Sequence, residues 1–151
     1  MPTYETFGRG CEFLEFQFQI LMKQAFKDFE VVISDHSKNE EIKNLCERYG
    51  DKLKIVYIHN PLNRGSLSHN TNNAIKNCSG NIIKILFQDD FLYGEDSLQK
   101  IYDSFTPDIQ WVIGSCEHIS DSSNDLFNKV VPRYSDEIMS GVNTIGNPSV
   151  V

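Results

Sequence analysis

Along most of the chain, the spacing of apolar residues alternates between a helical period and short β-branched runs. From Leu14 to Ala25, apolar residues recur at every third or fourth position, which predicts a helix with one buried face. Further on, uninterrupted apolar runs are typical of strands buried in a parallel sheet. The strands are predicted at residues 30–35, 53–58, 82–87 and 111–114.

Helical patterns separate these strands. The first covers residues 37–50, where Ser37 and Glu40 form a capping box and Gly50 ends the helix. Two further helices are predicted over residues 67–78 and 98–105. The alternation predicts an α/β fold: a Rossmann-like, mostly parallel sheet with helices on both faces.

The chain has 151 residues, 40% of them hydrophobic, so it can bury one core and is predicted to be a single domain, residues 1–151. No strand precedes the first helix, and the chain stops in the apolar run Pro148-Ser149-Val150-Val151. We therefore expect a partial domain that is incomplete at both ends. Its unpaired strand edges predict that the chain by itself is poorly soluble and inactive.

Composition excludes several classes of protein. The net charge of −7, with no cluster of basic residues, argues against a nucleic-acid partner. No stretch approaches the ~20 apolar residues that span a bilayer, and the N-terminus is not a signal peptide. We expect a cytoplasmic protein, and peripheral association with the inner face of the membrane is an open alternative. The four cysteines show no paired spacing, which favours reduced thiols.

Polar residues follow three of the predicted strands. Asp35 ends one, residues 60–68 follow another, and Asp89 and Asp90 end the third. The carboxyl ends of parallel strands meet at one rim of the sheet, where nucleotides bind. Taken this way, Asp35 is a rim carboxylate that contributes little to the core. Adjacent carboxylates there suit a hard divalent cation, although an Asp-Asp pair is equally compatible with a solvated turn that caps a helix.

Five short motifs follow one another along the chain. They are Pro2-Thr3-Tyr4-Glu5 before a helix, Asp35-His36-Ser37, Asn63-x-Gly65 with Asn70 and Asn72, Asn77-Cys78-Ser79-Gly80, and Gln88-Asp89-Asp90. Their order resembles the opening of family 2 glycosyltransferases, which have the GT-A fold. The resemblance covers nearly the whole chain, and only the ordered set makes it specific. Phe87 stands where the family's acidic motif has its first carboxylate.

The resemblance implies the donor-binding half of a glycosyltransferase. Tyr4 would stack on the base of a nucleotide-diphosphate sugar and Asp35 would accept a hydrogen bond from that base. Asp89 and Asp90 would hold Mn²⁺ or Mg²⁺ on the diphosphate. The residues implied in nucleotide-sugar binding are Pro2, Thr3, Tyr4, Glu5, Asp35, Ser37, Asn63, Asn70, Asn72, Gln88 and Asp89.

The implied reaction is inverting, metal-assisted transfer of the sugar to a hydroxyl of a glycan, lipid-linked or other acceptor. The family's general base lies beyond the segment that resembles residues 144–149, so it is expected beyond Val151. None of the late carboxylates matches it. Two alternatives stay open: a non-catalytic module that binds a nucleotide sugar or a metal, and a receiver-like domain with Asp35 as phosphoacceptor. The late carboxylates are Asp121, Asp125, Asp136 and Glu137.

Overall fold

A computed structural model describes residues 1–119 and 126–130. The chain divides into two compact units, Met1–Tyr102 and Asp103–Val151, which are described separately below. The expected α/β class is confirmed in the first unit. The carboxylates Asp121, Asp125, Asp136 and Glu137 and the segment 144–149 lie outside the described residues.

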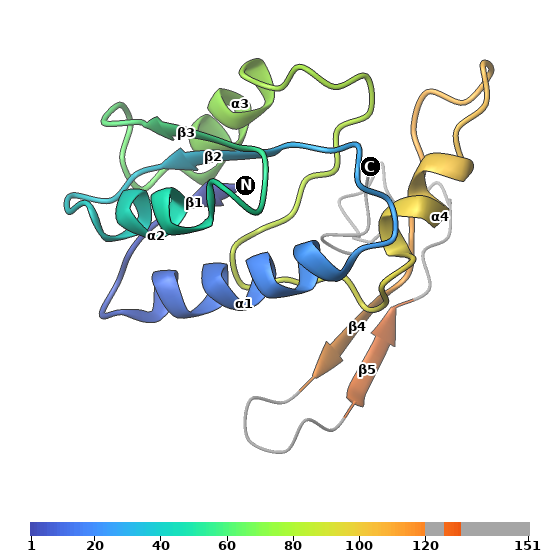
Figure 1. The fold of residues 1–151 in the computed structure, drawn as a ribbon, viewed down its shortest axis with the longest axis horizontal. Helices are drawn as coiled ribbons and strands as arrows, with labels where there is room; N and C mark the ends of the chain where they lie inside the picture. The colour runs from blue at the N-terminus through green and yellow to red at the C-terminus, as the bar shows by residue number, and fades with distance from the viewer. Residues whose placement is uncertain (120–125, 131–151) are drawn as a thin grey trace, which may run out of the picture. The chain divides into compact units, whose positions relative to one another are not determined.

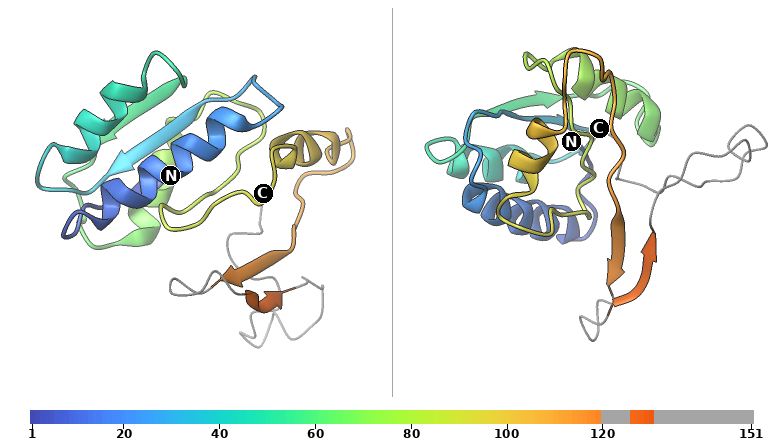
Figure 2. Two further views of the ribbon diagram at one scale, coloured as in Figure 1. Left: turned by 60° about the horizontal axis from the view of Figure 1, so that its bottom comes forward. Right: turned by 90° about the vertical axis from the view of Figure 1, so that its right-hand side faces the viewer.

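The first unit contains a three-stranded parallel sheet in the order β1 (Pro2–Thr3), β2 (Val31–Asp35) and β3 (Ile55–His59). Helices α1 (Arg9–Lys23) and α2 (Glu41–Tyr49) cover one face, and α3 (Leu67–Lys76) covers the other (Figures 1 and 2). A fourth helix, α4 (Ser97–Asp103), follows a long loop. Because β1–α1–β2 and β2–α2–β3 cross over in the same sense, α1 and α2 share a face.

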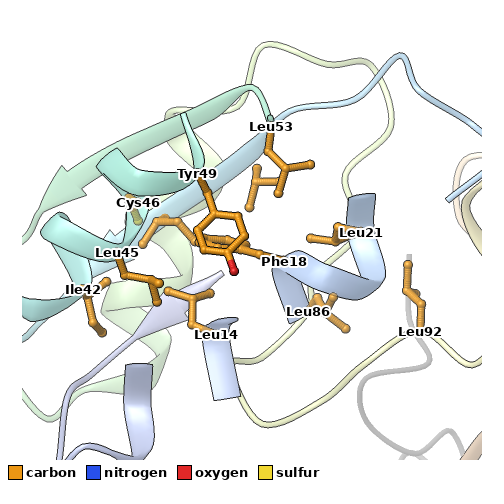
Figure 3. Close-up of a cluster of buried hydrophobic side chains, with 12 residues drawn as sticks. Leu14, Phe18, Leu21, Ile42, Leu45, Cys46, Tyr49, Leu53, Leu86 and Leu92 are labelled. Carbon is orange, nitrogen blue, oxygen red and sulfur yellow. The ribbon is translucent and has the colours of Figure 1, made fainter. Parts of the chain in front are cut away.

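The core of this unit forms between α1, α2 and β2. Leu14 and Phe18 of α1 and Leu45 of α2 have no exposed surface, as the helical spacing predicts. The Tyr49 ring packs against Phe18 with their centroids 5.1 Å apart. Figure 3 shows these side chains interdigitating, with Leu86 and Leu92 closing the cluster from the segment that follows α3.

The strand predicted at residues 82–87 does not form. This segment belongs to neither sheet of the described residues. The reason lies in β1, which pairs with β2 through Pro2 and Thr3, with Met1 extending the ladder by one residue, and so offers only a short edge for another strand. A cavity of about 510 Å³ is lined by Met1, Val31 and Val32 on the sheet side and by the residues from Ile82 to Leu86.

The predicted capping box is also wrong. Helix α2 begins at Glu41 with Glu40 as its N-cap, and no side chain caps it. The Ser37 hydroxyl instead donates to the Asp35 carboxylate and accepts from the Glu5 N–H. Ser37 therefore serves contacts at the ends of β1 and β2 and does not cap the helix. Other boundaries shift less, since α3 ends at Lys76 and α4 at Asp103.

In the second unit, the strand predicted at residues 111–114 is reduced to an isolated bridge at Ile113. An antiparallel hairpin follows, formed by β4 (Cys116–Ile119) and β5 (Leu126–Val130), with a register shift between His118 and Ile119. The loose apolar pattern beyond Cys116 did not predict it. No helix in the described part of the chain has the length and apolarity needed to cross a bilayer.

Candidate functional site

The carboxyl ends of β1 and β2 meet at a shared rim. Thr3 is the register partner of Asp35, and the His36 N–H continues the ladder by donating to the Thr3 carbonyl over 3.0 Å. Beyond the strand ends, the Glu5 N–H donates to the Ser37 hydroxyl over 2.7 Å. The motifs Pro2–Glu5 and Asp35–Ser37, which lie 30 residues apart in the sequence, are therefore one local structure.

Asp35 lies inside this structure and has no exposed surface, so the expectation of a rim carboxylate with little part in the core is wrong. Its Oδ1 accepts the Ser37 N–H over 2.9 Å and the Ser37 hydroxyl over 2.5 Å. The Tyr57 hydroxyl donates to Oδ2 over 2.8 Å. Burial, and next the Asp35 carboxylate, raise the pKa of Tyr57, so this hydroxyl stays protonated and keeps donating.

The acidic motif reaches the same rim through Gln88. Its side-chain amide accepts from the Tyr4 N–H over 2.7 Å and donates to the Tyr4 carbonyl over 3.0 Å, so it pairs with the main chain as a neighbouring strand would. A turn closed by the Asp90 N–H and the Phe87 carbonyl leaves Asp89 exposed and Asp90 half-buried. Tyr4 is 45% exposed and is accessible to a stacking partner.

The predicted asparagines divide into two groups. Asn70 is buried, accepts from the Ser34 hydroxyl over 2.6 Å and donates to the Thr3 carbonyl over 3.2 Å. Asn72 is exposed on α3, and Asn63 is exposed at a left-handed position with φ of 53° in the preceding loop. The sequence interpretation missed Asn73, which donates to the Ser34 hydroxyl over 2.8 Å. Its spacing of three from Asn70, one helical turn, was the available signal.

Two further residues of this rim were not predicted to contribute. The Arg64 guanidinium donates to the main-chain carbonyls of His36 and Ser37 over 3.0 and 3.3 Å, which fastens the loop after β3 to the loop after β2. His36 is 3% exposed, and its Nε2 lies 3.1 Å from the Asn60 amide nitrogen. Burial lowers the pKa of His36, and the Arg64 charge adds to that effect.

Carboxylate oxygens are the ligands that Mn²⁺ and Mg²⁺ prefer, so the donor chemistry of Asp89 and Asp90 fits such an ion. A second group, formed by Glu5, Cys11 and Glu41, has ligand atoms within 4.8 Å of one another. There, Glu5 already accepts the N–H groups of Gly8 and Cys11 over 2.6 and 2.7 Å. Burial and Glu5 raise the pKa of the Cys11 thiol to about 12, so this group reads as the structural closure of the α1 N-terminus.

Comparison with known proteins identifies the family. The model of glycosyl transferase family 2 matches residues 1–144. The chain belongs to glycosyl transferase family 2. It is also similar to an uncharacterized glycosyltransferase of Rickettsia prowazekii (strain Madrid E), with 27% identity over 140 residues. That alignment covers 91% of this chain and 42% of the relative, so the chain spans less than half of the relative's length. No solved structure matches the chain.

Proposed function

We propose that this family 2 chain is the donor-binding part of a glycosyltransferase that moves a sugar from a nucleotide-diphosphate sugar to an acceptor hydroxyl. One observation carries the proposal: the ends of β1 and β2 and the Gln88–Asp90 turn converge at one polar rim. There, the Gln88 side chain hydrogen-bonds the main chain of Tyr4, and the exposed Asp89 is the next residue along the chain.

In this proposal, one group of rim residues binds the base of the donor and another binds its diphosphate. Tyr4 stacks on the base, and Asp35 receives a base N–H once the Tyr57 hydroxyl has moved aside. Asp89 and Asp90 hold Mn²⁺ or Mg²⁺ against the diphosphate. A cation held by these two carboxylates would supply positive charge next to the negative charge that builds on the departing nucleoside diphosphate. A carboxylate general base takes the acceptor proton as the acceptor oxygen displaces the nucleoside diphosphate in one step, which inverts the configuration at the sugar carbon.

The remaining proposed contacts follow the rim residues in chain order. Pro2 and Thr3 set the backbone that presents Tyr4, and Glu5 and Ser37 fix the loops on either side of it. Asn70 ties α3 to β1 and β2, and Asn63, in the loop that leads into α3, is proposed to contact the donor. Asn72 is proposed to contact the donor directly from the exposed side of α3.

A second candidate function, a non-catalytic module that binds a nucleotide sugar, is favoured by Phe87. The Phe87 side chain cannot make the ribose contact that the resemblance implies for a carboxylate at this position. Without that contact the sugar donor is oriented less firmly, which favours binding without transfer. In both cases the nucleotide binds at the same rim. Turnover of a nucleotide sugar by the full-length protein separates the two functions.

The test is calorimetric titration of the chain with UDP, GDP, ADP, CDP and dTDP, each with and without Mn²⁺. We expect one base to be preferred and its affinity to rise in the presence of Mn²⁺. Tyr4→Leu should weaken that affinity about tenfold, the ~1–3 kcal/mol that base stacking is worth. Tyr93→Leu, at an 88% exposed tyrosine, is the matched control. Absence of binding for all five nucleotides would contradict the proposal.

A further inference from the structure

Two buried glutamines on helix α1 are unexplained by the core. Gln17 is 2% exposed and Gln24, the C-cap residue of α1, is 0% exposed. They are seven residues apart, which places them two turns apart on the same side of the helix. Amide side chains rarely occupy such positions unless they hydrogen-bond, because burying an unpaired amide is costly.

Gln17 holds the near end of the acidic loop. Its Nε2 donates to the main-chain carbonyls of Phe87 and Asp90, the two residues that close the turn carrying Gln88 and Asp89. Its Oε1 is buried without a partner among the described residues. The opposite amide orientation would point Oε1 at two carbonyl oxygens, so the two loop contacts decide the orientation. A buried acceptor without a partner is costly, and an apolar side chain of this size would avoid that cost.

Gln24 holds the far end of the same loop. Its Nε2 donates to the Gly94 carbonyl over 2.8 Å, and its Oε1 accepts the Leu98 N–H over 3.0 Å. Next to it, the Ala25 N–H donates to the Glu95 carbonyl over 2.6 Å. Both ends of the segment from residue 87 to residue 98 are therefore fastened to one helix.

Between the two anchors, the segment buries Leu92 in the core cluster and exposes several other side chains. Asp89 is exposed, Tyr93 is 88% exposed, and Phe91 is 38% exposed with its ring edge-on to Phe16 of α1 at 5.4 Å between centroids. From residue 87 up to the start of α4 at Ser97, the segment contains no helix or strand. Hydrogen bonds from the side-chain amides of Gln17 and Gln24 to main-chain groups hold this segment in place of strand pairing.

We propose that Gln17 and Gln24 are positioning residues that hold the loop of residues 87–98 at both ends and so fix Asp89 and Asp90 for binding Mn²⁺. This inference rests on the proposed function. Gln17 acts on the turn itself, whereas Gln24 acts from the distant end of the loop. Removing the Gln17 N–H groups therefore affects the carboxylates more. Residues that orient metal ligands typically change metal affinity 10–100-fold when they are replaced.

The experiment compares the 151-residue wild-type chain with Gln17→Met, Gln17→Leu and Gln24→Met, which keep the volume and remove the amide. Gln19→Met, at an exposed glutamine of the same helix, is the control. Three quantities are measured for each: the free energy of unfolding in urea, amide hydrogen exchange of residues 88–98, and the Mn²⁺ affinity alone and with the preferred nucleoside diphosphate.

We expect both Gln17 variants to exchange faster at residues 88–91 and to bind Mn²⁺ about tenfold more weakly under conditions where all proteins are folded. Gln24→Met should exchange faster at residues 94–98 and lose less affinity, and Gln19→Met should match the wild type. Wild-type Mn²⁺ binding with unchanged affinity in the folded Gln17 and Gln24 variants would overturn the positioning role alone. A wild-type chain that binds neither Mn²⁺ nor any nucleotide would overturn the proposed function itself.

Discussion

The Tyr57 hydroxyl donates a hydrogen bond of 2.8 Å to Oδ2 of Asp35, from the strand next to it in the sheet. This bond occupies the oxygen that the proposed base contact requires, because the other oxygen of Asp35 already accepts from Ser37. Base recognition by Asp35 therefore competes with a bond inside the protein.

Tyr57→Phe tests this competition. With the hydroxyl removed, Oδ2 is available to a base N–H, so we expect the affinity for the preferred nucleoside diphosphate to rise about three- to tenfold. The free energy of unfolding should fall by ~1 kcal/mol, the net worth of one hydrogen bond. Tyr49→Phe, which removes the bond from a tyrosine to Glu15 on another part of the core, is the control. Unchanged or weaker binding in Tyr57→Phe would mean that Asp35 does not receive the base.

Asp35→Ala gives the complementary measurement. It leaves the hydroxyls of Ser37 and Tyr57 and the Ser37 N–H without their acceptor in a buried place. We expect a loss of ~2–5 kcal/mol in the free energy of unfolding, measured by urea denaturation, because each unpaired buried group costs ~1–3 kcal/mol. A loss below 1 kcal/mol would show that water satisfies these groups.

The sequence pattern predicts the elements around the core, but it does not predict the contacts between distant residues. The helix and strand periods of residues 14–59 predict the elements around the core, because apolar burial there follows local spacing. The pattern of residues 82–87 is equally strand-like, yet a strand also needs a neighbour, and β1 supplies only two residues. The roles of Gln17 and Tyr57 depend on partners 70 and 22 residues away, and no local pattern encodes such pairings.

The metal prediction separates the two adjacent carboxylates. Asp89 is exposed at the turn, whereas Asp90 is half-buried and its main chain is held by Gln17. Asp89→Asn should weaken Mn²⁺-dependent nucleotide binding by about tenfold or more without changing the unfolding free energy, since an exposed carboxylate contributes little to stability. Calorimetric titration with and without Mn²⁺ measures the effect, with Asp51→Asn, at another exposed turn carboxylate, as control. Equal affinity in all conditions would contradict a metal at Asp89.

His36 predicts a pH dependence of stability. Its Nε2 must accept from Asn60, because the Asn60 amide also donates to Asn70 Oδ1 over 3.2 Å, which fixes that amide's orientation. The pKa of His36 is lowered below its ordinary 6.5, mainly by burial. The unfolded chain therefore takes up the proton more readily, so the stabilisation is present above pH 6.5 and is lost as the pH falls below it.

The expected result is a free energy of unfolding that declines below pH 6.5, by at most about 1.4 kcal/mol per pH unit for this one proton. His36→Gln should reduce the decline, because glutamine can accept from Asn60 and does not titrate. His59→Gln, at an exposed histidine at the end of β3, should leave the decline as it is. Equal pH profiles for the wild type and His36→Gln would mean that another group titrates.

The cavity beside β2 predicts the effect of lengthening β1. The Met1 amine donates to the Val32 carbonyl over 2.7 Å and the Met1 carbonyl accepts from the Ser34 N–H over 3.0 Å, so Met1 already follows the parallel ladder. Residues added before it would continue along Val32 and Val31 into the cavity of about 510 Å³. The residues from Ile82 to Leu86 also line this cavity.

We therefore expect an engineered extension of four alternating β-branched residues to raise the free energy of unfolding by ~2–4 kcal/mol, through burial of apolar surface. A Gly-Ser extension of equal length is the control. Burial lowers the pKa of the Met1 amine to about 6 from 8.0, so stability falls as the pH drops from 8 to 6 in the unextended chain. Either extension turns this amine into an amide and should abolish that fall, but only the apolar strand should add stability at pH 8. Equal stability of the two extended chains at pH 8 would show that the cavity does not accept a strand.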